Sequence, residues 1–170
     1  MSSSIPPEPV PADEPIVRKR VTIDQPRALV WEALTLPERM NERMFPEPIE
    51  IVTTWQVGRA IVIRGDLHGA AFENTGTVLE FQPEALLAYS HLSSTSRLPD
   101  VPENHAVIEF GLTALAADQT ELTVTVRQFP TAVIYKHLAY DWNVTPEVIK
   151  RKLEARTAPS WMQSAFACRA

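Results

Sequence analysis

The spacing of apolar residues changes along the chain, and each spacing predicts a different kind of element. Residues 16–23 alternate imperfectly between apolar and polar side chains, as a β-strand with one mixed face does. After Asp24 the apolar spacing becomes three to four, because Val30, Trp31 and Leu34 share one face of a helix. Asp24 suits the cap position of that helix. A strand followed by a short helix is therefore predicted at the start of the pattern.

A second short helix is predicted from Glu38 to Met44. Pro37 restarts the chain after the first helix, and Met40 and Met44 then lie four residues apart on one helix face. Both helices come before the part of the chain in which the apolar residues alternate.

From Ile49 the apolar residues recur with a period of two, which indicates a run of short strands. The predicted strands span residues 49–55, 60–66, 75–82, 86–93, 105–113 and 121–128. Gly58 lies in the first connecting turn and can take a positive φ there. Glu73 and Asn74 fall in a turn region, to which we assign no further role. The last two strands carry apolar residues on one face and polar residues on the other, which predicts a sheet with one covered side.

The C-terminal part is predicted to be helical, with an interruption at Pro146. Val133 to Tyr140 can form one or two turns. A proline inside a helix removes a hydrogen bond and costs about 3 kcal/mol. We therefore expect Thr145 to cap a new helix from Pro146 to about Arg156, or the helix to kink at this point.

The two ends of the chain differ in composition from its middle. Residues 1–15 contain five of the fifteen prolines, which lack an N–H group and fix φ. This segment is predicted to be a disordered or polyproline-like arm, either inert or bound by a proline-recognising partner. Residues 157–170 are predicted to be a tail. The domain is thus expected to span residues 16–156.

Composition and charge narrow the class of protein. The chain has 170 residues, of which 45% are hydrophobic and 22% charged, and this fits one globular domain with tails. Its net charge of -5 argues against a general nucleic-acid-binding protein, because such proteins carry a basic face. The single cysteine, Cys168, excludes an intrachain disulfide and a cysteine-based metal site. No run reaches the length of a membrane span and no signal-peptide pattern is present, so we expect a cytoplasmic protein without a membrane partner.

Three stretches of the sequence carry a resemblance to one superfamily. They are PRALVWEALTLPERMNERMFP from Pro26, VGR at residues 57–59, and GTVLEFQPEALLAYSH from Gly76. They resemble an opening helix signature, a glycine-containing first hairpin and a strand pair. Together with the order strand, two short helices, six strands and helix, they are similar to the START/Bet v 1-like helix-grip superfamily, also called SRPBCC. Within it the closest resemblance is to the family named after the activator of the heat-shock chaperone ATPase (AHSA-like), over about residues 16–155.

The resemblance implies an α+β helix-grip fold. In that fold a curved seven-stranded antiparallel sheet wraps around a C-terminal helix, and two short helices follow the first strand. A hydrophobic cavity between sheet and helix is implied as well. No catalytic set is implied, because the superfamily includes lipid carriers, hormone receptors and cyclases, and a fold alone does not give function.

Three residues of the strand 86–93, Leu87, Tyr89 and His91, share one face. If that face lines the cavity, a phenol and an imidazole enter an otherwise apolar site, where they can orient a ligand or move a proton near neutral pH. The alternative is a structural pair that hydrogen-bonds each other, water or the backbone.

Aromatic residues and methionines are the candidate walls of the cavity. With the two polar residues they give the predicted ligand-binding set His91, Tyr89, Trp55, Phe110, Trp142, Met44 and Phe45. Aromatic rings supply contact area, and methionine adapts to irregular shapes. Ordinary core packing explains the same residues equally well.

Two further groups of polar residues point to weaker hypotheses. Arg64 and Asp66 share a strand face and His68 follows, so they form either a carboxylate-binding site or an exposed charged strand end. The histidines show no spacing that converges on a metal, and we expect neither a metal nor a cofactor.

The leading hypothesis is a binding module for a small hydrophobic or aromatic molecule. One alternative is a cyclase or dehydratase that uses His91 and Tyr89 as acid and base. The other is a chaperone-related protein-interaction module. A non-enzymatic role is favoured, with a small hydrophobic ligand as partner, no nucleic acid, no membrane, and a homodimer left open.

Overall fold

The structure of the protein is a computed structural model that describes residues 15–44 and 47–155. The predicted arm at residues 1–15 lies outside these ranges except for Pro15, and the predicted tail at residues 157–170 lies wholly outside them. The domain limits of 16–156 therefore stay a prediction.

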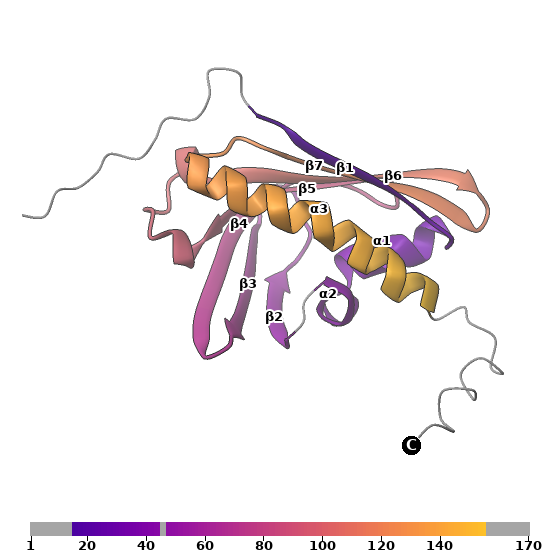
Figure 1. Cartoon of the computed structure of the whole chain (residues 1–170), viewed down its shortest axis with the longest axis horizontal. Coiled ribbons are helices and arrows are strands. Elements are labelled where there is room, and N and C mark those ends of the chain that lie inside the picture. Colours follow the sequence, from indigo (N-terminus) through magenta and orange to yellow (C-terminus); the bar gives the residue numbers. More distant parts are fainter. Residues whose placement is uncertain (1–14, 45–46, 156–170) are drawn as a thin grey trace, which may run out of the picture.

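Seven strands form one antiparallel sheet, and three helices accompany it (Figure 1). The elements are β1 (Val17–Ile23), α1 (Arg27–Thr35), α2 (Pro37–Met44), β2 (Ile49–Thr53), β3 (Ala60–Leu67), β4 (Ala70–Gln82), β5 (Leu86–Ser93), β6 (Ala106–Ala116), β7 (Gln119–Arg127) and α3 (Ala132–Ala155). The strand order is β1-β7-β6-β5-β4-β3-β2. This is the predicted α+β helix-grip fold, with two short helices after the first strand and a long helix across the sheet.

The sheet has two sides, which we call the inner face, turned toward α3, and the outer face, turned away from it. Successive side chains of a strand alternate between these faces. Residues of the inner face join α1 and α3 in one core, as Leu87, Phe110 and Val124 do from neighbouring strands. Apolar residues thus cover the inner face along its length.

Helix α3 presents one apolar stripe to the inner face. Its buried residues are Leu138, Trp142, Pro146, Ile149 and Leu153. Because they recur at three- and four-residue spacing, they lie on one side of the helix. Polar bonds then fix its C-terminal half: the Gln25 side-chain amide donates to the Leu153 carbonyl oxygen at 3.0 Å.

The expectation of a new helix starting at Pro146 is wrong. Helix α3 runs through this proline from Ala132 to Ala155. The carbonyl oxygen of Trp142 loses its usual partner, because proline has no N–H group. The Pro146 ring is buried within the apolar stripe, and this burial offsets the lost bond.

Two other local expectations are wrong. Strand β4 begins at Ala70 rather than Thr75, so Glu73 and Asn74 are strand residues and the turn lies at His68 and Gly69, both with positive φ. The side chain of Asp24 does not cap α1, whose cap position is Pro26 without a side-chain bond.

The connection between β5 and β6 folds over the outer face. It contains two short 3₁₀ turns, Ser94–Ser96 and Pro102–Asn104. Beside it Leu92 and Val107 are buried outside the main core. The connection therefore gives the outer face a small apolar layer of its own.

Within the described ranges no helix is long and apolar enough to cross a membrane.

Candidate functional site

Tyr89 lies on the inner face and is in contact with the aromatic core. It is only 3% exposed. Its ring centroid lies 6.0 Å from that of Phe110, and the ring of Phe110 meets that of Trp142 edge-on at 5.4 Å. Strands β5 and β6 and helix α3 thus bring three of the predicted ligand-binding residues together.

The polar groups of Tyr89 and His91 are without partners. Neither side chain makes a hydrogen bond or ion pair with any described residue. Burial raises the pKa of the Tyr89 phenol above its usual range. Burial, together with the nearby His105 and His137, lowers the pKa of the His91 imidazole to about 4. At neutral pH the site therefore holds a protonated phenol beside a neutral imidazole.

A third polar residue on this face, Asn74, was not predicted. Strand β4 pairs Asn74 with Ser93, so its side chain shares the inner face with His91 two residues earlier on β5. Its Oδ1 atom is buried and has no hydrogen-bond partner in the described structure. The signal in the sequence is the alternation of Phe72, Asn74 and Val78, which places one amide in an otherwise apolar row.

The sheet is irregular next to His91. A Cβ atom on Gly76 would lie 1.7 Å from the carbonyl oxygen of Ser90, so only glycine fits at this position. The Thr77 N–H donates to the Ser90 hydroxyl oxygen at 2.9 Å in place of a ladder bond. On the other side His91 is paired with Ala106. Small residues therefore leave the imidazole few bulky neighbours within the sheet.

Trp55 belongs to a different aromatic cluster. Its indole N–H donates to the Thr35 carbonyl oxygen at 2.7 Å, and its ring stacks on Phe81 at 5.9 Å. Phe81 in turn lies 5.3 Å from Trp31. Trp55 thus ties the loop after β2 to α1 and is not brought to the Tyr89, Phe110 and Trp142 rings.

The two remaining predicted wall residues lie outside what the structure describes. Met44 ends α2, but its side chain is not described, and Phe45 falls in the gap between the described ranges. Their place in the ligand-binding set stays a prediction.

The charged strand residues form an exposed ion-pair cluster. The Arg64 guanidinium lies 2.6 Å from the Glu73 carboxylate and 3.4 Å from that of Glu50. These carboxylates occupy the arginine, which argues for the exposed charged strand end over a carboxylate-binding site. In the described part of the chain no three His, Cys, Asp or Glu residues gather as a metal site would require.

The comparisons with known proteins concern nearly the whole described domain. The sequence model of the family described as "Activator of Hsp90 ATPase homolog 1-like protein" matches residues 24–154. Among solved structures, ChR145 from Cytophaga hutchinsonii is 36% identical with a TM-score of 0.71, and the alignment covers 85% of this chain and 97% of that one.

Two more distant structures are similar in fold. The Aha1 dimer from Colwellia psychrerythraea is 19% identical with a TM-score of 0.63, over 82% of this chain and 96% of that one. The Zhui aromatase/cyclase from a Streptomyces species is 20% identical with a TM-score of 0.63, over 86% and 98% of the two chains. No curated protein matched the sequence.

Proposed function

The chain belongs to the AHSA-like family of the SRPBCC superfamily, and from this premise we propose that it binds a small hydrophobic or aromatic molecule between the inner face and α3. The polar end of that molecule lies at Tyr89, His91 and Asn74, and its apolar body lies against Phe110 and Trp142. The cytoplasm stays the proposed location.

One observation carries the proposal. The Tyr89 hydroxyl, the His91 imidazole and the Asn74 amide oxygen come from two neighbouring strands and share the inner face, yet none has a partner in the described structure. The Asn74 oxygen is also buried, and a buried polar group without a hydrogen bond costs about 1–3 kcal/mol, so a fold that keeps it beside two further partnerless groups needs a reason. A ligand that supplies the partners is such a reason.

The character of the ligand's polar end follows from the charges. His91 is neutral at pH 7, and the groups that shift its pKa are two other histidines rather than a lysine, an arginine or a carboxylate. A charged ligand end would therefore have no counter-ion beside His91. The polar end is accordingly uncharged, such as a hydroxyl or a ketone.

Binding of 2-naphthol tests this proposal, because the probe joins an aromatic body to a neutral hydroxyl. We expect it to quench the fluorescence of Trp142 and to bind His91→Phe about tenfold more weakly, as one lost hydrogen bond of about 1.4 kcal/mol requires. Naphthalene, which lacks the hydroxyl, should bind both proteins alike. Equal 2-naphthol affinities for the two proteins, or no binding to either, would overturn the proposal.

An enzymatic role is the second candidate, because a group that can accept a proton and a group that can donate one share the inner face. A neutral imidazole can accept a proton and a protonated phenol can donate one, and the two residues lie about 7 Å apart along the strand. In a dehydration, His91 would take the α-proton of a β-hydroxy ketone while Tyr89 protonates the departing hydroxyl, which leaves as water. The Zhui neighbour is described as an aromatase/cyclase.

The dehydration of 4-hydroxy-4-phenylbutan-2-one, followed by the absorbance of the conjugated product, tests this role. A rate that both Tyr89→Phe and His91→Phe abolish supports it. If the native protein dehydrates the substrate no faster than the variant that carries both Tyr89→Phe and His91→Phe, the chain is a binding protein only.

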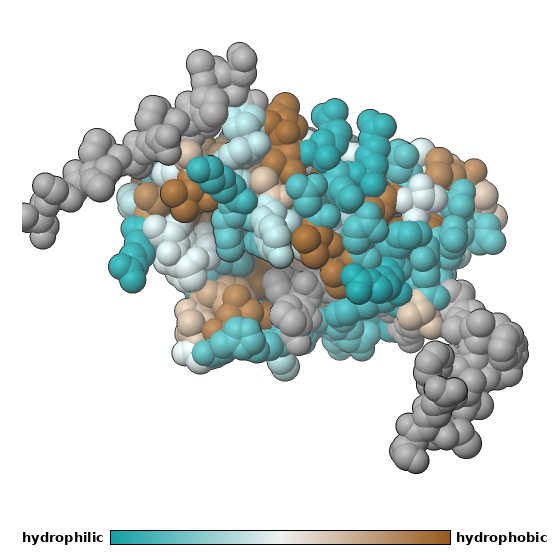
Figure 2. All heavy atoms as spheres, in the orientation of Figure 1, coloured by the Kyte–Doolittle hydropathy of each residue, from teal (hydrophilic) through white to brown (hydrophobic). Residues whose placement is uncertain are grey.

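A second copy of the chain is the proposed protein partner. Helix α3 exposes Val133, Tyr140 and Val144 on the side opposite its buried stripe, and apolar patches lie among hydrophilic ones on this face of the molecule (Figure 2). The Colwellia neighbour is a dimer in solution. Light scattering after size exclusion should show a dimer that Tyr140→Glu dissociates; a monomer at all concentrations would refute this. The description of the matching family is what supports the chaperone-related role.

A further inference from the structure

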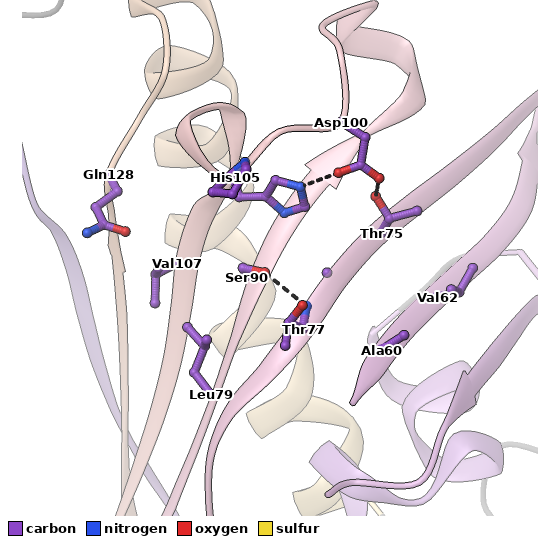
Figure 3. A pocket seen from close by; sticks show the side chains of 12 residues that line it. Ala60, Val62, Thr75, Thr77, Leu79, Ser90, Asp100, His105, Val107 and Gln128 are labelled. Atoms are coloured by element: carbon purple, nitrogen blue, oxygen red, sulfur yellow. Dashed lines mark hydrogen bonds and ion pairs between the residues drawn. The ribbon is translucent and has the colours of Figure 1, made fainter. Parts of the chain in front are cut away.

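A second binding region lies on the outer face, on the opposite side of the sheet from Tyr89 and His91. It is an open groove of about 580 Å³, and that volume falls within the range of small-molecule sites. Outward-facing residues of four strands and the connection between β5 and β6 line it (Figure 3). The lining residues that carry the argument are Val62, Thr75, Leu79, Ser90, Asp100 and His105.

The groove exists because its floor is made of small residues. Ala60, Gly76 and Ser90 line it where bulkier side chains would fill the space. The Ser90 hydroxyl oxygen accepts the Thr77 N–H at 2.9 Å and is thereby held at the floor (Figure 3). The connection after β5 rises beside this floor as one wall.

A chain of polar contacts runs along that wall. His105 Nε2 lies 2.7 Å from Asp100 Oδ1, and the Thr75 hydroxyl donates to Asp100 Oδ2 at 3.3 Å. A carboxylate only accepts hydrogen bonds, so the proton on Nε2 points to Asp100. In the neutral imidazole Nδ1 then carries a lone pair, and in the described structure this atom is buried without a partner.

The groups in the groove therefore favour hydrogen-bond donors. Asp100 is 65% exposed and brings a negative charge to the groove. The lining contains no lysine or arginine. An anion would meet the carboxylate with no lysine or arginine to hold it, whereas an ammonium group would pair with that carboxylate, and the lining hydroxyls of Thr77 and Ser90 can accept from it.

Apolar side chains lie on both sides of the floor (Figure 3). Val62, Leu79 and Val107 line the groove from β3, β4 and β6. They offer contact to the body of a ligand whose charged end lies at Asp100.

We propose that this outer groove is a site for a small organic amine, whose ammonium group pairs with Asp100 at the edge of His105 and whose apolar body lies on Val62, Leu79 and Val107. The site is independent of the ligand proposed for the inner face, because the two lie on opposite sides of the sheet.

The test uses the whole chain, with benzylamine as the amine and benzoate as the anion of the same size. The methyl resonances show on which face of the sheet a probe binds. Val62, Leu79 and Val107 line the groove on the outer face, whereas Val124 and Val126 belong to the core on the inner face. Benzylamine should shift the groove methyls and leave the inner methyls in place, and benzoate should shift neither set.

Asp100→Asn keeps the shape of the side chain and removes its charge, so benzylamine should bind about tenfold more weakly. Glu103→Gln is the matched control, because Glu103 is exposed in the same connection and does not line the groove. A second variant, Leu79→Lys, places a cation on the exposed outer face and should abolish binding without touching the Asp100 contacts.

Three results would overturn the proposal. They are equal affinity for benzylamine and benzoate, shifts confined to the inner methyls, and benzylamine affinity unchanged by both Asp100→Asn and Leu79→Lys.

Discussion

The ring of Phe110 meets the indole of Trp142 edge-on at a centroid distance of 5.4 Å, and this contact joins strand β6 to the middle of helix α3. Both side chains are buried, with exposed fractions of 1% and 8%. Trp142 lies one turn before Pro146, where the helix lacks one backbone hydrogen bond. The aromatic contact thus anchors the helix at the place where its own hydrogen bonding is weakest.

Replacing Trp142 with alanine should lower the free energy of unfolding by about 3–5 kcal/mol, because a large side chain leaves a cavity in the core. Urea unfolding followed by circular dichroism measures the loss. Lys136→Ala is the control: Lys136 is exposed on the same helix and should cost little. Equal losses for the two variants would show that α3 does not depend on this contact.

Gly76→Ala should destabilise the sheet. The added Cβ would lie 1.7 Å from the Ser90 carbonyl oxygen, so β4 and β5 must move apart, at a cost of about 1–3 kcal/mol. Gly111→Ala on strand β6 is the matched control, because nothing lies within 4 Å of its added Cβ. Unfolding curves that coincide for the two variants would contradict the close approach at Gly76.

The lowered pKa of His91 predicts a pH dependence of stability. The folded protein holds His91 neutral down to about pH 4, while the unfolded chain takes up a proton near pH 6.5. In this window the unfolded state binds more protons, so the free energy of unfolding falls as pH drops from 6.5 to 4. The loss attributable to His91 is on the order of 1–3 kcal/mol.

Urea unfolding of the native protein and of His91→Phe across this range isolates the contribution, because other titrating groups are common to both proteins. The difference in unfolding free energy between them should change steadily between pH 6.5 and 4 and level off below. A difference that does not vary with pH would mean that His91 is not held neutral.

Removal of residues 1–15 should leave the domain folded. The segment has no apolar periodicity in its sequence, and its prolines cannot donate backbone hydrogen bonds. Differential scanning calorimetry should show a melting temperature close to that of the whole chain. A drop of several degrees would show that the segment docks on the domain.

Much of the fold could be predicted from periodicity, because each element buries one face of a regular pattern. The alternation of Tyr89 and His91 with Ala88 and Ser90 placed the first pair on one side of the sheet, and the structure has them on the inner face. The length of β4 was missed, since the glutamate, asparagine and glycine at positions 73, 74 and 76 are all residues that strands disfavour. Neighbouring strands, rather than local propensity, hold that stretch extended.

The parts of the site that could not be predicted depend on contacts between distant segments. Helix α3 continues through Pro146, whose ring is buried, and this burial is invisible in the helix sequence alone. Residue type groups Trp55 with Trp142, but the Trp55 indole N–H donates to the carbonyl oxygen of Thr35, twenty residues earlier. The partnerless amide of Asn74 required the register with β5 to be known.

Intermolecular nuclear Overhauser effects between 2-naphthol and the methyl groups of the chain test the central claim most directly. If the ligand lies between the inner face and α3, its ring protons should show cross-peaks to methyls of Ile108, Val124 and Ile149, which are buried in the core there. His91→Phe should weaken these cross-peaks while leaving the spectrum of the fold unchanged. Cross-peaks only to outer-face methyls such as those of Val62 and Leu79, or none at any ligand concentration, would contradict the claim.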